Sequence, residues 1–216
     1  MRSCLRVLRV LPVAALWSVV VGAGAAHADV PRTADGNGVM VGSGWPGTAP
    51  VQLEIFCDPQ CPYCAQLEST YGDQVAADVA SGRLAVTYRW LTFLDERHHN
   101  DVSARISNAL FVAADPTTSA DAYQAFVQDL YRHQSSEGPS NNDIAAMARE
   151  SGVPELLADR IAAGDYAVDA AALNDANRAR LDQVNPENPG TPTVYELGAN
   201  RLVDIQDPGW LDDVSS

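Results

Sequence analysis

The chain has 216 residues and a formal net charge of −14 at neutral pH, from 28 acidic residues against 14 basic ones. A surface this acidic argues against nucleic acid or anionic membrane lipid as a partner. The length suits one domain with a good core, or a core that carries a sizeable insertion.

The first 28 residues have the composition of a secretory signal peptide. Three arginines precede residue 10, an apolar stretch follows, and Ala26-His27-Ala28 supplies a small-x-small cleavage site. The uncharged stretch over 10–26 is just shorter than the roughly 18 residues of a membrane span, so we expect cleavage near Ala28 and not a retained anchor. Cys4 would leave with the leader. The remaining 188 residues, with a net charge of −17, would act in the periplasm or cell envelope, or be secreted.

Residues 29–50 are rich in glycine, proline, aspartate and asparagine, which predicts an irregular N-terminal arm. A first strand is predicted at Val51–Phe56, followed by a helix from near Cys61 to about Ala80, with Pro62 at the favoured first helical position. Residues 84–91 are rich in β-branched and aromatic side chains and are typical of a second central strand.

Between residues 98 and 184 apolar side chains recur at the three- and four-residue spacing of helices. The helices expected there are Val102–Ala114, Ala120–His133, Asn142–Ser151, Pro154–Ala163 and Val168–Val184. Strand character returns at 191–197 and 201–205, and a very short last helix is expected after residue 210. This order predicts an α/β thioredoxin fold, built from 51–94 and 185–216, with an inserted helical domain at 95–184.

Cys61 and Cys64 form a C-x-x-C motif where the first strand gives way to a helix, a context typical of a thioredoxin-like redox centre. An isolated cysteine has a pKa of about 8.5, and the free N–H groups and dipole of a helix N-terminus favour the thiolate. We therefore expect Cys61 to be the acidified, attacking thiol and Cys64, one turn further in, to be the resolving thiol.

A second motif, Gly190-Thr191-Pro192-Thr193, lies about 130 residues downstream and directly before a predicted strand. Proline is tolerated at the first position of a strand. A cis bond before Pro192 would turn the chain sharply and present unpaired backbone groups to whatever lies opposite. Because Pro186 and Pro189 precede it, an ordinary proline-rich loop is the alternative interpretation.

The run Phe56–Cys64, taken together with Gly190–Thr193, resembles the DsbA-like family of exported thiol–disulfide oxidoreductases. The resemblance extends over about residues 51–205. It implies that Cys61 forms the mixed disulfide and Cys64 resolves it. It also implies that Pro192 is a cis-proline packed against both cysteines, and that the substrate peptide contacts Thr191, Pro192, Pro62 and Tyr63.

The same resemblance implies reduced or misfolded exported proteins as substrates and a membrane quinone-linked oxidase that reoxidises the dithiol. We expect a monomer, with no cofactor, no metal and no nucleic acid. Oxidation of substrates is the favoured direction. Two alternatives stay open: a reductase or isomerase of the DsbG type, and a redox-silent thioredoxin-like binding or chaperone module.

Several motif residues resemble the isomerase and reductase branch, DsbC and DsbG, which keeps the reductase or isomerase alternative open. These are the Pro62-Tyr63 pair, Asp58 and Thr191. Proteins of that branch carry a separate N-terminal dimerisation domain, for which residues 29–50 are too short. DsbA itself has histidine where this chain has Tyr63, and a neutral tyrosine cannot supply the same charge to a thiolate. We therefore expect a less oxidising centre than that of DsbA.

Position 55 departs from the family pattern. Many relatives place an acid six residues before the first cysteine, where this chain has Ile55. Glu54 is adjacent, but its side chain should point to the opposite face of the strand. We expect Glu54 to be a solvated charge at the strand edge, with a role as proton acceptor as the weaker alternative.

Cys57 is the cysteine that the C-x-x-C motif leaves out. We expect a small buried residue at the end of the first strand; the alternative is an accessory redox thiol that pairs with Cys61 or with another chain. The spacing C-x3-C-x2-C also suits an iron–sulfur cluster, and zinc held by the cysteines and a histidine is a further alternative. We expect neither metal, and we expect His98, His99 and His133 at the surface.

Overall fold

The structure is a computed structural model that describes residues 30–42, 49 and 51–215. The predicted signal peptide, residues 1–28, lies outside these residues, as does part of the predicted arm. Among the helices of the described residues, none has the length and hydropathy that crossing a membrane requires.

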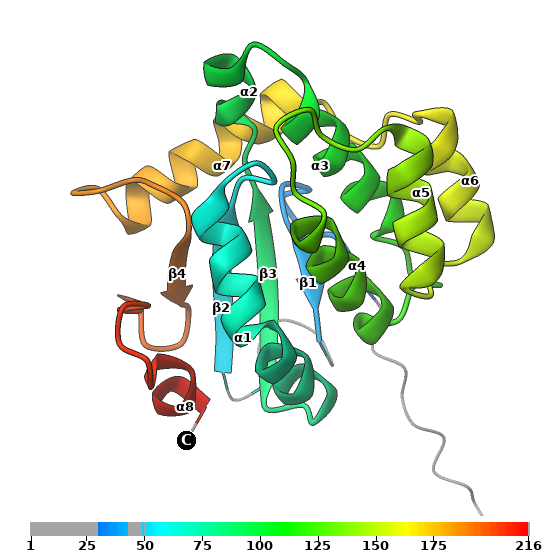
Figure 1. Cartoon of the computed structure of the whole chain (residues 1–216). Coiled ribbons are helices and arrows are strands. Elements are labelled where there is room, and N and C mark those ends of the chain that lie inside the picture. Colours follow the sequence, from blue (N-terminus) through cyan, green and yellow to red (C-terminus); the bar gives the residue numbers. More distant parts are fainter. Residues whose placement is uncertain (1–29, 43–48, 50, 216) are drawn as a thin grey trace, which may run out of the picture.

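A five-stranded sheet with the order β1-β3-β2-β4-β5 lies at the centre of the molecule (Figure 1). Strand β2 (Val51–Cys57) pairs in parallel with β3 (Leu84–Trp90) and antiparallel with β4 (Thr193–Glu196). The edge strands β1 (Val39–Val41) and β5 (Arg201–Leu202) both pair antiparallel with their neighbours. Strand β1 corrects the prediction of an irregular arm: it is only three residues long, and the turn-forming residues around it concealed it.

The helices are distributed unevenly along the chain. Helix α1 (Pro62–Ala80) connects β2 to β3, and α8 (Trp210–Ser215) follows β5. The helices between β3 and β4 are α2 (Phe93–His98), α3 (Val102–Ala113), α4 (Ala120–Arg132), α5 (Asn141–Glu150), α6 (Glu155–Ala163) and α7 (Ala170–Val184). The predicted helix boundaries lie within one or two residues of these, but α2 was not predicted. The α/β architecture is the expected thioredoxin fold with an inserted helical region.

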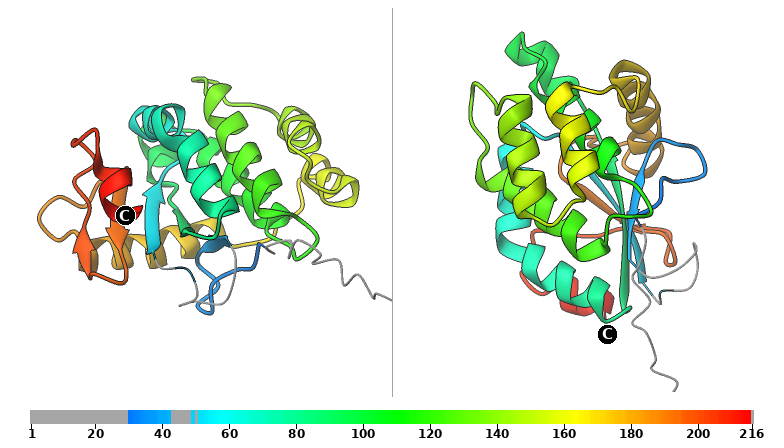
Figure 2. Two further views of the ribbon diagram at one scale, coloured as in Figure 1. Left: turned by 90° about the horizontal axis from the view of Figure 1, so that it is seen from below. Right: turned by 90° about the vertical axis from the view of Figure 1, so that its right-hand side faces the viewer.

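Helices cover both faces of the sheet, with α1 and α4 on one side and α7 on the other (Figure 2). Side chains along β2 alternate between these faces, as they must in a strand. Leu53, Ile55 and Cys57 belong to the large core under α1, whereas Phe56 packs with Leu181 of α7. This alternation places the Cys57 side chain on the same side as the start of α1.

Candidate active site

Cys61 is the N-cap residue of α1. Its backbone is extended (φ −75°, ψ 118°), Pro62 begins the helix, and the Cys61 carbonyl accepts hydrogen bonds from the backbone N–H of Cys64 (3.1 Å) and Ala65 (3.2 Å). The predicted helix start is therefore confirmed. It places the first cysteine at the end of the helix where the dipole is positive.

The second motif lies directly against this cysteine. The Thr191–Pro192 peptide bond is cis, as the family resemblance implied, so the segment is more than an ordinary proline-rich loop. Cys61 Sγ lies 3.4 Å from the carbonyl oxygen of Thr191, although the two residues are 130 positions apart in the sequence. The structure thus brings together the two motifs that sequence analysis singled out.

A groove of about 510 Å³ runs beside the two motifs. Its lining includes Tyr63, which is 67% exposed, and the Thr191-Pro192 pair. Tyr71 from α1 and Gln206 from the segment after β5 also line the groove. The walls of the groove are thus partly aromatic and partly polar, and uncharged.

The three thiols of the described chain are free and buried; Cys61 retains 4% exposure, and Cys57 and Cys64 retain none. The neighbouring Cys64 thiol and burial raise the pKa of Cys61, while the backbone N–H of Cys64 lowers it. Burial also raises the pKa of Cys57 and Cys64. In the dithiol form the expected acidification of Cys61 is therefore wrong, because the hydrogen bond with the Cys64 thiol and burial raise the pKa of Cys61.

Asp58 anchors the loop that leads into Cys61. Its buried carboxylate accepts hydrogen bonds from the backbone N–H of Gln60 (2.9 Å) and Leu94 (3.0 Å) and from the Ser103 hydroxyl. Burial raises the pKa of Asp58 to about 6. Asp58 thereby ties the loop to α2 and α3, which makes it a positioning residue.

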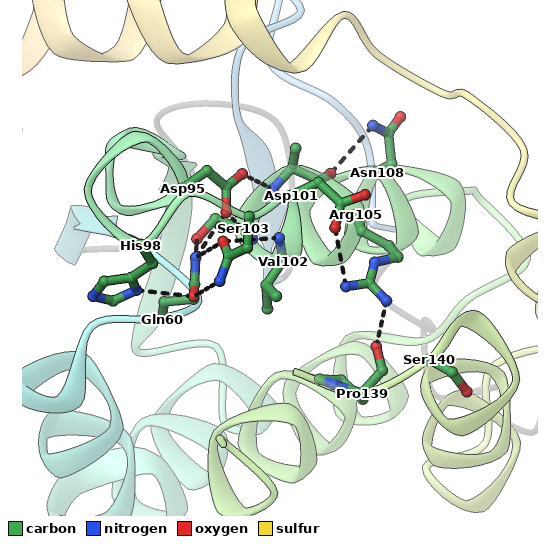
Figure 3. Close-up of polar contacts among 12 residues, drawn as sticks. Gln60, Asp95, His98, Asp101, Val102, Ser103, Arg105, Asn108, Pro139 and Ser140 are labelled. Atoms are coloured by element: carbon green, nitrogen blue, oxygen red, sulfur yellow. Dashed lines mark hydrogen bonds and ion pairs between the residues drawn. The ribbon is translucent and has the colours of Figure 1, made fainter. Parts of the chain in front are cut away.

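Gln60 fills the space between the same loop and the inserted helices (Figure 3). Its Nε2 lies 2.7 Å from Asp95 Oδ1 and 2.9 Å from Ser103 Oγ, and its Oε1 lies 2.9 Å from Asn100 Nδ2 and 3.0 Å from His98 Nδ1. Sequence analysis missed this network. No signal identified it, because its members come from separate elements that meet only in the fold.

Glu68 is a buried carboxyl that sequence analysis also missed. It follows Cys64 by four residues on α1, so both lie on the helix face that packs on the sheet. Glu68 Oε1 accepts a hydrogen bond from the Tyr88 hydroxyl (2.9 Å), and Oε2 accepts one from Gln124 Nε2 (3.1 Å). Burial raises the pKa of Glu68 to about 7. Its spacing from a buried cysteine was the one available clue.

Glu54 is not the solvated charge that we expected. It is 2% exposed, and its carboxylate pairs with Arg89 Nε (2.9 Å) of β3 and Arg180 Nη2 (2.7 Å) of α7. Both arginines are remote in sequence, so the strand pattern could not reveal them. Glu54 faces α7, whereas Ile55 faces the core under α1, on the side of the cysteines. The alternative role of Glu54 as proton acceptor for the thiols is thus wrong for geometric reasons.

Within residues 30–42, 49 and 51–215, no group of three or more His, Cys, Asp and Glu side chains is arranged to hold a metal ion. Cys57 is buried at the end of β2, as expected. His98, His99 and His133 are exposed, which confirms their predicted surface position.

Comparison with known proteins gives the same picture. The thioredoxin family model matches residues 36–200. The chain is also 30% identical over 181 residues to the serine/threonine-protein kinase PknE of Mycobacterium tuberculosis. That match covers 81% of this chain but 31% of the kinase, so the chain spans about a third of that relative's length.

Several solved structures have the same fold. MdbA, a thiol-disulfide oxidoreductase from Corynebacterium diphtheriae, matches with a TM-score of 0.71 at 18% identity, over 86% of this chain and 92% of its own. Reduced DsbA from Mycobacterium tuberculosis matches with a TM-score of 0.63 at 23% identity, over 83% and 91%. DsbG from the same organism matches with a TM-score of 0.64 at 24% identity, over 83% and 86%. The thioredoxin family model covers well over half of this chain, and the chain therefore belongs to the thioredoxin family.

Proposed function

We propose that this chain is a thiol–disulfide oxidoreductase that exchanges disulfides with exported proteins through Cys61 and Cys64. The observation that carries the proposal is the contact between Cys61, at the N-terminus of α1, and the Thr191 carbonyl beside a cis-proline. Cys61 attacks and forms the mixed disulfide; Cys64, fully buried behind it, resolves that disulfide. No cofactor is needed, because the electrons move between sulfur atoms.

The groove beside Cys61 is the proposed binding site for the substrate polypeptide. Tyr63 and Pro192 offer apolar surface, while Thr191 offers backbone groups for an extended chain. Such a site recognises backbone and a few side chains and so accepts many sequences. It suits reduced or misfolded proteins in a compartment outside the cytoplasm, with a membrane quinone-linked oxidase to restore the disulfide.

Oxidation of substrates is the proposed direction, but one observation favours the reductase or isomerase alternative. A strongly oxidising dithiol owes its potential to a stabilised reduced form, which needs a low thiol pKa. Here the Cys64 thiol and burial raise the pKa of Cys61. The neutral Tyr63 brings no compensating charge. We therefore expect a centre that oxidises proteins less strongly than one with a stabilised thiolate.

The test uses variants of the two cysteines and a reduced, unfolded protein as acceptor. The oxidised wild-type chain should transfer its disulfide, and Cys61→Ser should lose the transfer by at least about 10³-fold, the scale on which removal of a nucleophile acts. Cys64→Ser, offered a protein that contains a disulfide instead, should accumulate a mixed disulfide between Cys61 and that protein, visible on a non-reducing gel, because no thiol at position 64 resolves it. Unchanged transfer by Cys61→Ser would refute the proposal and leave a redox-silent binding module.

The reduction potential of the Cys61/Cys64 couple decides the direction. Equilibration with glutathione buffers, followed by thiol alkylation, measures it. A value near about −120 mV would identify a strong oxidant and one near about −270 mV a reductant. We expect a value between these limits.

A further inference from the structure

Cys64 contacts two thiols. Its side chain lies within hydrogen-bonding distance of Cys61 on one side and of Cys57 on the other. The Cys61 thiol in turn meets the Thr191 carbonyl at the edge of the groove. Cys64 is therefore the neighbour that the thiol beside the groove and the thiol at the end of β2 have in common.

The fold holds Cys57 beside Cys64 through the alternation of β2. Cys57 is the last residue of the strand and points to the α1 face, where it has no exposed surface. The Tyr131 hydroxyl of α4 is a hydrogen-bonding neighbour of its thiol and also reaches the Asp58 carbonyl oxygen (3.3 Å). Cys57 is thus a thiol fixed beside the resolving cysteine.

We infer that Cys64 can exchange its disulfide partner, so that the oxidised chain interconverts between a Cys61–Cys64 and a Cys57–Cys64 disulfide. The inference rests on the proposed function, which supplies the Cys61–Cys64 disulfide. Its geometric basis is the position of Cys64 between two thiols, from which a change of one side-chain rotamer redirects the sulfur.

The exchange is balanced in atoms and electrons. The Cys57 thiolate attacks Cys64 Sγ, a new S–S bond forms between them, and the Cys61–Cys64 bond breaks with its electron pair leaving on Cys61. The proton that Cys57 loses is taken up by the Cys61 thiolate, so the charge balances as well. The number of disulfides stays constant, so no oxidant or reductant takes part. The Cys64 backbone N–H near Cys61 stabilises the leaving thiolate.

The two oxidised forms would differ in chemistry. The Cys61–Cys64 form presents a disulfide to the groove and can oxidise a dithiol. The Cys57–Cys64 form presents a free Cys61, which can attack an incorrect disulfide in a bound polypeptide. With Cys64 already paired, the resulting mixed disulfide is not resolved by this chain, so a second thiol of the substrate displaces Cys61. That sequence is disulfide isomerisation.

Alkylation of the oxidised full-length chain tests the inference. In the Cys61–Cys64 form Cys61 cannot react with iodoacetamide; after exchange it can, and alkylation then traps the Cys57–Cys64 disulfide. Peptide mass mapping assigns every label and disulfide to its cysteine, Cys4 included. We expect native wild-type protein to acquire label at Cys61 together with a Cys57–Cys64 disulfide.

The matched control is Cys57→Ala, which keeps the Cys61–Cys64 disulfide but removes the exchanging thiol. Labelling of Cys61 should fall at least about tenfold relative to wild type, the margin that separates exchange from background reduction. Equal labelling in the two proteins, or no label at Cys61 in wild type after prolonged incubation, would overturn the inference.

A second variant keeps the test informative if Cys57→Ala does not fold. Cys61→Ser, treated with diamide, should form an intramolecular Cys57–Cys64 disulfide, and two alkylatable thiols at these positions would contradict it. This readout does not depend on activity. If the wild-type chain transfers no disulfide to an acceptor but Cys61→Ser still joins Cys57 to Cys64, the proposed function fails and the pairing itself stands.

Discussion

Glu54 and Glu68 are both buried against the central sheet, but they lie on opposite faces and have different partners. On the α7 face, Glu54 pairs with the guanidinium groups of Arg89 and Arg180. On the α1 face, Glu68 is hydrogen-bonded by neutral groups, the Tyr88 hydroxyl and the Gln124 amide. Its pKa is raised to about 7 by burial.

The difference separates two uses of a buried acid. A carboxylate held between two arginines joins α7 to the strands through ion pairs. A carboxyl surrounded by neutral donors changes its protonation state near neutral pH. The α1 face also contains the three cysteines, and the Glu68 charge raises the pKa of Cys57. Ion pairs of Glu54 thus attach the inserted helix α7 to one face of the sheet. On the other face, beside the thiols, Glu68 titrates near neutral pH.

The largest effect should come from the α7 face. Replacing Glu54 with alanine removes the buried carboxylate shared by Arg89 and Arg180, leaves Arg89 paired with Asp35 alone, and should cost about 3 kcal/mol in the free energy of unfolding. Urea denaturation followed by circular dichroism measures this loss. Arg201→Ala is the matched control, because it breaks an exposed pair with Glu196 and should cost about 1 kcal/mol or less. Equal costs for the two variants would show that the Glu54 cluster is no stronger than a surface pair.

On the α1 face we predict that replacing Glu68 with glutamine increases the free energy of unfolding, opposite to the effect of Glu54→Ala. The Glu68 pKa of about 7 exceeds its ordinary value of 4.5, so between these pH values the folded protein retains a proton that the unfolded chain has lost. Stability therefore falls as the pH rises through this window. Glu68→Gln removes the effect and should be more stable than wild type by about 2–3 kcal/mol at pH 8, but by close to zero at pH 4.

Denaturation of both proteins at the two pH values measures that difference. The amide fits the site, because the Tyr88 hydroxyl can accept from it while donating to Gln124 Oε1, from which it lies 2.8 Å. Glu96→Gln, on the exposed surface of α2, is the control and should show no such pH dependence. A stabilisation by Glu68→Gln that is equal at pH 4 and pH 8 would mean that Glu68 does not titrate in this range.

The smallest effect should come from the hydrogen-bond network of Gln60, before Cys61. Gln60→Ala removes the hydrogen bonds that Gln60 makes with Asp95, Ser103 and Asn100 and should cost about 1–2 kcal/mol. Urea denaturation measures the cost, and Gln66→Ala, at an exposed position of α1, should cost about 0.5 kcal/mol or less. A loss as large as that of Glu54→Ala would show that the hydrogen bonds of Gln60 contribute as much to stability as the ion pairs of Glu54.

The cysteine motif, the position of the Thr191-Pro192 segment and the order of the central elements were predictable from the sequence, whereas the cis bond was implied only by the family resemblance. Each depends on residues close together in the chain: a strand followed by Cys61 and Pro62, or Thr191-Pro192 followed by a strand. Periodicity of three and four residues was enough to place the longer inserted helices. Local patterns of this kind are the strongest signal that a single sequence contains.

The sequence-based predictions that were wrong share a physical cause. Whether Glu54 is solvated depends on Arg89 and Arg180, which are 35 and 126 residues away, and no local pattern reports such distances. The acidification expected at Cys61 follows from the helix N-terminus, but burial beside Cys64 appears only after the chain has folded. Strand β1 and helix α2 were missed because three and six residues are too few to establish a period.

The register in which β2 pairs with β4 determines whether Thr191 lies against Cys61. Phe56 lies opposite Thr193, and Ile55 opposite Val194, in a ladder of only four residue pairs. A shift of one residue along this ladder would turn the β4 side chains to the wrong faces. A shift of two residues would keep the faces but displace Thr191 from Cys61 by about 7 Å, because each residue of a strand advances by about 3.4 Å. The backbone hydrogen bonds of this short ladder, and not the cysteines themselves, therefore determine whether Cys61 and the Thr191-Pro192 segment come together.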